Sequence, residues 1–144
     1  MKVDFWKLSS DPAEKVVALI AQRVLDGGER LLVVSKDGDQ RAAISAALWK
    51  AGPTSFLANG EADAPGADRQ PVLLSEAPDA ANGASHVIYA DGEYRAASRF
   101  ERSFLLFDDA TLEQARATWR SLDGTEALER AFFRQEGGKW IKVA

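Results

Sequence analysis

The sequence contains no cysteine and a single histidine, His86. The absence of cysteine excludes disulfides, cysteine-based zinc sites and thiol nucleophiles, and it fits a reducing cytoplasm. His86 has no second histidine or cysteine with which to form a zinc site or a triad, so we expect a structural role for it. No serine lies in the G-x-S-x-G pattern of a nucleophile elbow. The sequence therefore presents no recognisable catalytic constellation.

Long apolar runs and a surplus of basic residues are also missing. No apolar run reaches the roughly 18 residues of a membrane span, and residues 1–10 lack the apolar core of a signal peptide. We therefore expect a cytoplasmic protein that does not associate with membranes. The net charge is −4, whereas proteins that grip the phosphate backbone usually have a basic surplus. We expect no strong direct binding to nucleic acid.

Glycine-rich phosphate loops are absent from the two turns where they would be expected. The segments LSSDP and SKDGD match neither G-x-x-x-x-G-K-[ST] nor G-x-G-x-x-G, and Asp37 and Asp39 would repel phosphate. Asp108 and Asp109 could hold Mg²⁺, although acids at the start of a helix are the simpler interpretation. We expect no cofactor and no metal.

The rest of the chain is organised around residues 30–57. Residues 31–35 form an uninterrupted apolar or small run, which is typical of a strand covered on both faces. A polar turn follows, then a helix with apolar residues at helical spacing, an exit at Pro53, and a strand predicted over residues 55–57. This βαβ unit predicts an α/β fold: one domain, residues 1–144, with a mostly parallel sheet flanked by helices, Rossmann-like but without a nucleotide-binding loop.

Further elements follow from the same patterns. Strands are predicted over residues 3–8, 72–74, 86–89 and 103–107, helices over 12–26 and 112–122, and a surface loop over 58–70. Residues 126–135 admit two structures. The segment could continue as helix, since EALERAFFRQ is rich in helix formers, or it could form a hairpin with KWIKV across Glu136 and two glycines. We favour the helix.

Two groups of aromatic and basic residues have an open interpretation. Trp49 and Phe56 stand at a helix end and in the next predicted strand, where their rings could meet, either in the core or at an interface. Arg116 and Arg120 share one helix face beside Trp119. That face is either an ordinary solvated surface or an anion-binding patch with an adjoining apolar surface. Such a patch would suit an acidic peptide that ends in a hydrophobic residue.

Several segments, in their order and spacing, resemble the chi subunit family of bacterial DNA polymerase III. They are FWKL, LLVV, ALW…SFL, SFLLFD, ARxxWR and FFRQ…GGKW, which together span nearly the whole chain. Two positions depart from the family pattern. Ala58-Asn59 stand in place of Pro-His, and Phe132-Phe133, with Arg134 before Gln135, stand in place of an aromatic-Trp pair.

The resemblance implies a non-catalytic accessory subunit of the bacterial polymerase III holoenzyme. Such subunits link the clamp loader to single-stranded DNA-binding protein during replication. The resemblance places the clamp-loader side, through a partner called psi or another clamp-loader component, at Leu48, Trp49 and Phe56. It places the acidic C-terminal tail of single-stranded DNA-binding protein at a set of basic and apolar residues: Leu105, Arg116, Trp119, Arg120, Lys139 and Trp140.

Two other functions fit the residues less well. The block LLVVSKDGDQRAAISAAL also resembles a strand and helix of helicase motor domains, which would make the chain a degenerate nucleotide-binding or helicase-like enzyme domain. That function requires a Walker lysine or an arginine finger, and neither is evident. The third alternative is a purely structural subunit of a homo-oligomer.

Overall fold

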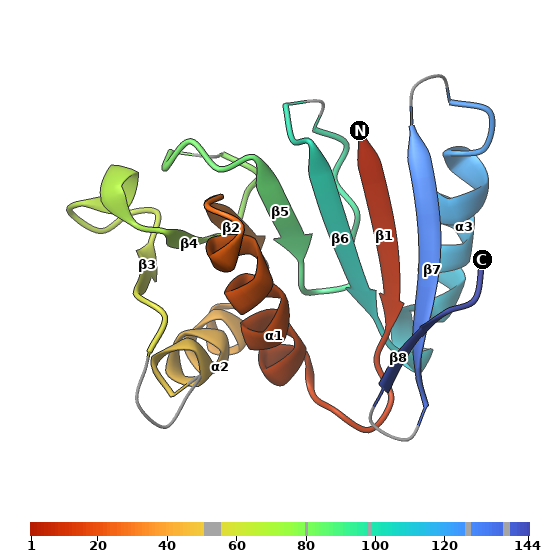
Figure 1. Ribbon diagram of the computed structural model, residues 1–144, viewed down its shortest axis with the longest axis horizontal. Helices are drawn as coiled ribbons and strands as arrows, with labels where there is room; N and C mark the ends of the chain where they lie inside the picture. The colour runs from red at the N-terminus through yellow and green to blue at the C-terminus, as the bar shows by residue number, and fades with distance from the viewer. Residues whose placement is uncertain (51–55, 80, 98, 126–127, 137–138) are drawn as a thin grey trace.

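The computed structural model describes residues 1–50, 56–79, 81–97, 99–125, 128–136 and 139–144. The described strands form one eight-stranded sheet in the order β3-β4-β2-β5-β6-β1-β7-β8 (Figure 1). All neighbours run parallel except β7 and β8, which are antiparallel. The predicted α/β class with a mostly parallel sheet is confirmed. The strands are β1 Lys2–Lys7, β2 Leu31–Val34, β3 Asn59–Glu61, β4 Val72–Ser75, β5 His86–Tyr89, β6 Arg102–Phe107, β7 Glu129–Glu136 and β8 Lys139–Lys142.

Helices cover both faces of this sheet. On one face lie α1 (Ala13–Asp26) and α2 (Gly38–Trp49), and on the other α3 (Leu112–Ser121) passes behind β1 and β7 (Figure 1). Two short 3₁₀ helices, η1 (Ala67–Arg69) and η2 (Asp109–Thr111), precede β4 and α3. No helix among the described residues is both long and apolar enough to cross a bilayer.

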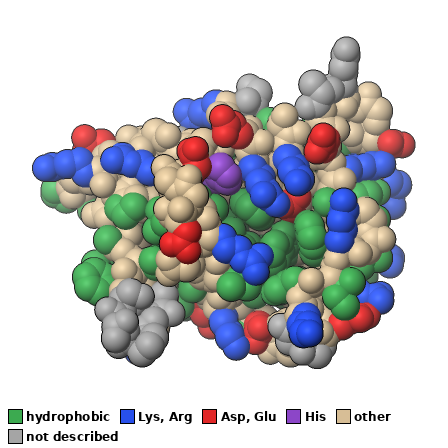
Figure 2. Space-filling model, in the orientation of Figure 1, with side chains coloured by type: hydrophobic (Ala, Val, Ile, Leu, Met, Phe, Trp, Pro, Cys, Tyr) green, Lys and Arg blue, Asp and Glu red, His purple; other side chains and the backbone are tan. Residues whose placement is uncertain are grey.

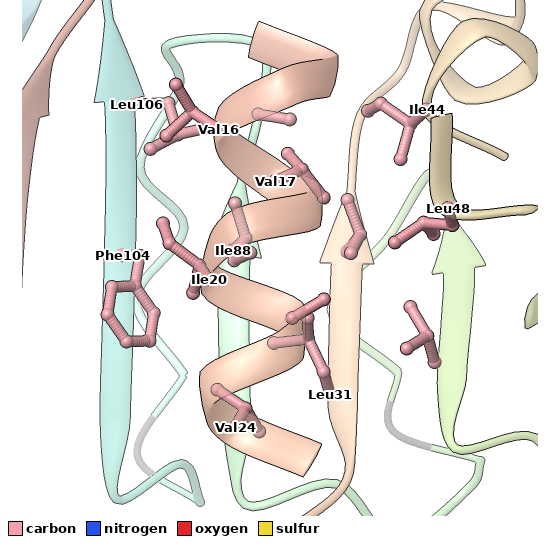
Figure 3. Close-up of a cluster of buried hydrophobic side chains, with 14 of the residues drawn as sticks. Val16, Val17, Ile20, Val24, Leu31, Ile44, Leu48, Ile88, Phe104 and Leu106 are labelled. Atoms are coloured by element: carbon pink, nitrogen blue, oxygen red, sulfur yellow. The ribbon is translucent and has the colours of Figure 1, made fainter. Parts of the chain in front are cut away.

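Two apolar clusters, one on each face, hold the layers together. On the first face the apolar stripe of α1 points at β5 and β6, with Ile20 close to Ile88 and Phe104 (Figure 3). Ile44 and Leu48 of α2 join the same cluster. Side chains alternate along a strand. Trp6 of β1 therefore belongs to this cluster, whereas Val3 and Phe5 of the same strand belong to the cluster under α3. Each fully buried side chain of this size contributes about 1.5–3 kcal/mol of transfer free energy.

The order of the strands creates a change of direction between β1 and β6. From β1 the chain crosses by α1 to β2 on one face, whereas from β6 it crosses by α3 to β7 on the other face. The adjacent carboxyl ends of β1 and β6 therefore border a crevice, which is the usual ligand position in open α/β sheets. Among the described helices, α3 alone packs on this face against β1 and β7, so it determines what is exposed at that end of the sheet.

Three local predictions were wrong. Residues 129–136 are a strand rather than a helix, and β7 and β8 form the hairpin. Phe56 and Leu57 belong to no strand, and the next strand begins at Asn59. The predicted surface loop over residues 58–70 contains β3 and η1. Pro53, Ser55, residues 126–127 and residues 137–138 lie outside the described residues.

Gly92, after β5, gives a testable measure of how tightly the segments that follow the adjacent strands β5 and β6 pack against each other. Its φ is +80°, and a Cβ there would come within 2.7 Å of Cγ2 of Thr111, which caps η2 together with Asp108. We expect Gly92→Ala to lower the free energy of unfolding by about 2 kcal/mol in urea titrations, from backbone strain and this clash together. Gly83→Ala is the control, because φ there is +71° with no atom within 4 Å. Equal losses in both variants would show that the contact with Thr111 costs nothing.

Candidate functional site: an apolar cavity with a basic rim

A cavity of about 520 Å³ lies between α3 and the end of the sheet formed by β1 and β7. Its walls are mostly apolar, and its rim holds the cationic groups of Lys7, Arg116, Arg120 and Arg134. The apolar lining comes from four separate stretches of the chain: Phe5, Phe107, Leu112, Ala115, Trp119, Phe132 and Val143, with Ala144. No acidic side chain of the described residues lines it. The cavity is therefore suited to a ligand that combines an apolar group with negative charge.

The amphipathic pattern of α3 explains which side chains reach the cavity. Leu112, Ala115 and Trp119 turn toward the sheet, as their spacing predicts, and Ala115 is buried. Arg116 and Arg120 are exposed and lie one turn apart, so both guanidinium groups reach the same side of the helix. The sequence prediction that these two arginines share a face beside Trp119 is confirmed.

Trp119 is held in one position by contacts on several sides. Its ring meets Phe5 edge to face at a centroid distance of 5.1 Å and Phe132 at 6.3 Å. The Arg130 guanidinium lies 4.3 Å from the ring centroid and donates a hydrogen bond to the Trp119 carbonyl. A second hydrogen bond from Arg130 to Asp123, at 2.9 Å, fixes that guanidinium. Trp119 therefore forms a preformed wall of the cavity.

The structure changes the rest of the predicted tail site. Leu105 is fully buried beneath the α3 cluster and does not line the cavity, so it cannot be a contact residue. Trp140 points to the opposite face, where its ring lies 4.6 Å from that of Trp6. Lys139 is exposed at the start of β8, opposite Glu136, and is not part of the lining either. Of the six residues predicted for the tail site, three line the same cavity: Arg116, Trp119 and Arg120.

Several lining residues were missed because they come from strands that are distant in sequence. Phe5, Phe107 and Phe132 meet only because β1 pairs with both β6 and β7. Phe5 lies opposite Phe132 in the register, and Lys7 lies opposite Arg134. A signal did exist in Phe132 and Phe133, since adjacent aromatic residues in a strand face opposite sides of a sheet. Such alternation would have separated Phe132, at the cavity, from Phe133, on the other face.

A second exposed apolar feature lies at the other end of the sheet, where α2 leads toward β3. The side chains of Trp49 and Phe56 are 48% and 61% exposed, and their ring centroids are 5.1 Å apart. The two rings therefore do meet, and their exposure contradicts the interpretation that they lie in the core. Leu48, which was grouped with them, is fully buried against α1 and the sheet, so it belongs to the core.

The crevice at the carboxyl ends of β1 and β6 is acidic. It is lined by Ser9, Gln40 and three aspartates, Asp11, Asp91 and Asp108. Hydrogen bonds from Gln135 and Lys15 lower the pKa of Asp11. Burial raises the pKa of Asp91, but hydrogen bonds from Arg95 and from the Lys36 backbone outweigh it and leave that pKa lowered. Both carboxylates are therefore charged at neutral pH and would repel a phosphate here.

The other candidate chemical groups have structural roles. Asp108 accepts a hydrogen bond from the Thr111 N–H at 3.1 Å in a capping box, which confirms the helix-start interpretation of this acid. Burial lowers the pKa of His86, whose ring stacks on Phe104 and contacts Ser85. No cluster of three or more metal-binding side chains occurs in the described part of the chain.

Figure 2 shows the face that bears α1 and α2, where Lys and Arg side chains surround an apolar area and acidic side chains lie among them. The cavity beside α3 lies on the opposite side of the sheet. The basic rim is thus a local feature of a chain whose net charge is −4.

Comparison with known proteins identifies the family of this chain. A search of curated proteins finds no match for this sequence. The family model described as "DNA polymerase III chi subunit, HolC" matches residues 1–127 of the 144. The matched region includes β1 to β6, α3 and the exposed aromatic pair, and it ends before β7. The chain therefore belongs to the family of DNA polymerase III chi subunits, accessory subunits of a replicative polymerase.

Proposed function

We propose that this chain is a non-catalytic adaptor that binds the acidic C-terminal tail of single-stranded DNA-binding protein in the cavity beside α3. The supporting observation is the pairing of an apolar lining with four cations, with no acidic side chain among the described residues that line the cavity. Such a tail has several aspartates and ends in a hydrophobic residue with a free carboxylate. The terminal side chain would enter between Phe5, Trp119 and Phe132, and the carboxylates would pair with arginine at the rim.

The exposed pair Trp49–Phe56 serves as the clamp-loader side, for psi or another clamp-loader component. Large exposed aromatic side chains in contact with each other typically mark binding surfaces, where Trp is a frequent anchor. The sheet order puts β3, which follows Phe56 in the chain, at one end and the cavity beside β1 and β7 toward the other. Two partners could therefore be bound at the same time without touching, which is what an adaptor requires.

A nucleotide-binding or helicase-like enzyme is the weaker candidate. Its ligand would lie in the carboxyl-end crevice, which presents Asp11, Asp91 and Asp108 to it. Two bases beside this crevice are already paired with its acids: Arg95 with Asp91 at 2.7 Å and Lys15 with Asp11 at 3.0 Å. Arg116, Arg120 and Arg134 line the cavity beside α3 and not that crevice, so none of them is placed as an arginine finger there.

We expect Arg120→Ala to weaken binding of an acidic peptide that ends in phenylalanine by about 1–3 kcal/mol, because a charge-assisted hydrogen bond is lost. Arg116→Ala should weaken binding less, because Arg116 is already paired with Glu113 at 2.9 Å. Isothermal titration calorimetry measures this, with the same peptide lacking its last residue as the second ligand. The exposed Arg69 of η1 provides a matched control, since Arg69→Ala removes the same charge at the far end of the sheet. Unchanged affinity in both Arg116→Ala and Arg120→Ala would place the tail elsewhere.

We expect Trp49→Ala to remove most clamp-loader binding, at a cost of about 2 kcal/mol or more, while the domain stays folded. The measurement is capture of psi and the clamp-loader subunits from an extract of the source cells by the immobilised protein, quantified by mass spectrometry. Trp49→Phe should retain part of the binding, because it keeps an aromatic ring next to Phe56. If Trp49→Ala captures these subunits as well as the unmodified protein does, the surface has another role.

A further inference from the structure

Three of the four cations at the cavity rim are paired with acids that do not line the cavity. Lys7 lies 3.5 Å from Asp109, Arg116 lies 2.9 Å from Glu113, and Arg134 lies 2.6 Å from Glu136. Arg120 makes no ion pair with any described residue. The three acids come from η2, α3 and β7, so they surround the rim from different elements.

These ion pairs are exposed and therefore easily exchanged. The acidic side chains of Asp109 and Glu113 are 91% and 81% exposed, and that of Glu136 is 48% exposed. Exposed pairs of this kind contribute little net stability because water competes for both partners. A carboxylate on a ligand can replace one of these acids, but the exchange substitutes one pair for another and adds little free energy.

We propose that Asp109, Glu113 and Glu136 are specificity-determining residues of this cavity, an inference that rests on the tail-binding function proposed above. By occupying three cations, they leave the rim with little unbalanced positive charge. A ligand that offers negative charge alone gains only from Arg120. A ligand that also places an apolar side chain against Phe5, Trp119 and Phe132 gains the burial of that group.

The same acids discriminate against nucleic acid. Binding of single-stranded DNA depends on several cations acting together on consecutive phosphates, because each contact releases a counterion. At this rim, phosphates would have to displace three carboxylates of the protein itself from their cations. The displaced carboxylates would then remain close to the DNA backbone. Like charges in such positions oppose association. The cavity thus accepts a protein tail and rejects the DNA to which single-stranded DNA-binding protein itself is bound.

The test is a triple variant in the full chain, called the rim variant, which combines Asp109→Asn, Glu113→Gln and Glu136→Gln. Its control is Asp39→Asn, Asp63→Asn and Glu76→Gln, three exposed acids outside the cavity lining. Both variants change the net charge equally. The ligands are an oligothymidylate, an acidic peptide ending in phenylalanine, and the same peptide without that residue, each titrated by fluorescence anisotropy.

In the rim variant we expect about a tenfold gain in affinity for the oligothymidylate and for the shortened peptide, and a smaller gain for the complete peptide. The ratio between the two peptides should therefore fall. Adding Arg116→Ala to the rim variant should remove part of the gain, which would locate the effect at the cavity. The control variant should show no more than the general effect of lower negative charge.

Equal oligothymidylate affinities in the rim and control variants would overturn the inference, as would an unchanged ratio between the two peptides. If the complete peptide binds none of the proteins, the proposed tail-binding function fails instead. The oligothymidylate titrations still decide the role of the three acids in that case, because they depend only on the rim cations.

Discussion

Replacing Leu48 by alanine is expected to lower the free energy of unfolding by about 3 kcal/mol. Leu48 is fully buried among Ile44, α1 and the sheet, so truncation removes buried methyl groups and leaves a cavity that rigid neighbours fill only in part. Equilibrium unfolding in urea, followed by circular dichroism, measures the loss. A change in the midpoint without a change in the slope would show that stability has fallen while the surface exposed on unfolding is unchanged.

The next residue along the chain provides the control. Trp49 is 48% exposed, so Trp49→Ala should lower stability by no more than about 1 kcal/mol while it reduces partner binding. The two variants should thus have different defects. Leu48→Ala should unfold at lower urea concentration, and Trp49→Ala should bind the partner more weakly. If Leu48→Ala keeps full stability and loses partner binding, the original assignment of Leu48 to the interface is correct after all.

The second large effect is expected at the ion pair between Asp4 and Arg102. Asp4 is fully buried, and its Oδ2 accepts hydrogen bonds from Arg102 Nε, at 2.9 Å, and from the Arg102 Nη2. Its Oδ1 has no partner among the described residues. We expect Arg102→Met to cost about 3 kcal/mol in urea unfolding at neutral pH, because it leaves a buried carboxylate uncompensated. Methionine keeps apolar contact with Phe104, over which the guanidinium lies.

A second substitution tests whether the uncompensated charge is the cause. Asp4→Asn combined with Arg102→Met replaces the carboxylate by a neutral amide, so this double variant should be more stable than Arg102→Met alone. If the double variant is no better, the loss comes from the packing of the arginine side chain rather than from the charge. An Arg102→Met protein as stable as the unmodified one would show that the pair contributes nothing.

The sequence predicts those parts of the fold where one local pattern determines the outcome. The continuous apolar runs at β2 and β6 and the helical spacing in α1 and α3 correspond to elements of the structure. The α3 face with Arg116, Trp119 and Arg120 could be derived in the same way, since neighbours on one helix are set by local geometry. Ile44 and Leu48, four residues apart, already indicated that Leu48 is part of the core face of α2.

Residues whose position depends on distant strands could not be predicted in this way. Residues 129–136 contain good helix formers, but Phe133 faces one apolar cluster, Phe132 faces the other, and Ala131 is buried. Burial on both faces between β1 and β8 stabilises a strand and overrides helix propensity. The contact of Phe5 with Phe132 in the cavity lining depends on the pairing of β1 with β7. The position of Trp140 on the opposite face depends on the pairing of β7 with β8.

The position of β1 between β6 and β7 also determines the order of events during synthesis. Lys2 lies opposite both Arg102 and Glu129, which are 100 and 127 positions later in the chain. At about 5–20 residues per second, β1 leaves the ribosome on the order of ten seconds before β7. During that interval Phe5 cannot reach its native neighbours. The cavity is therefore among the last parts of the molecule to form, and a nascent chain acquires this binding site only after β7 has emerged.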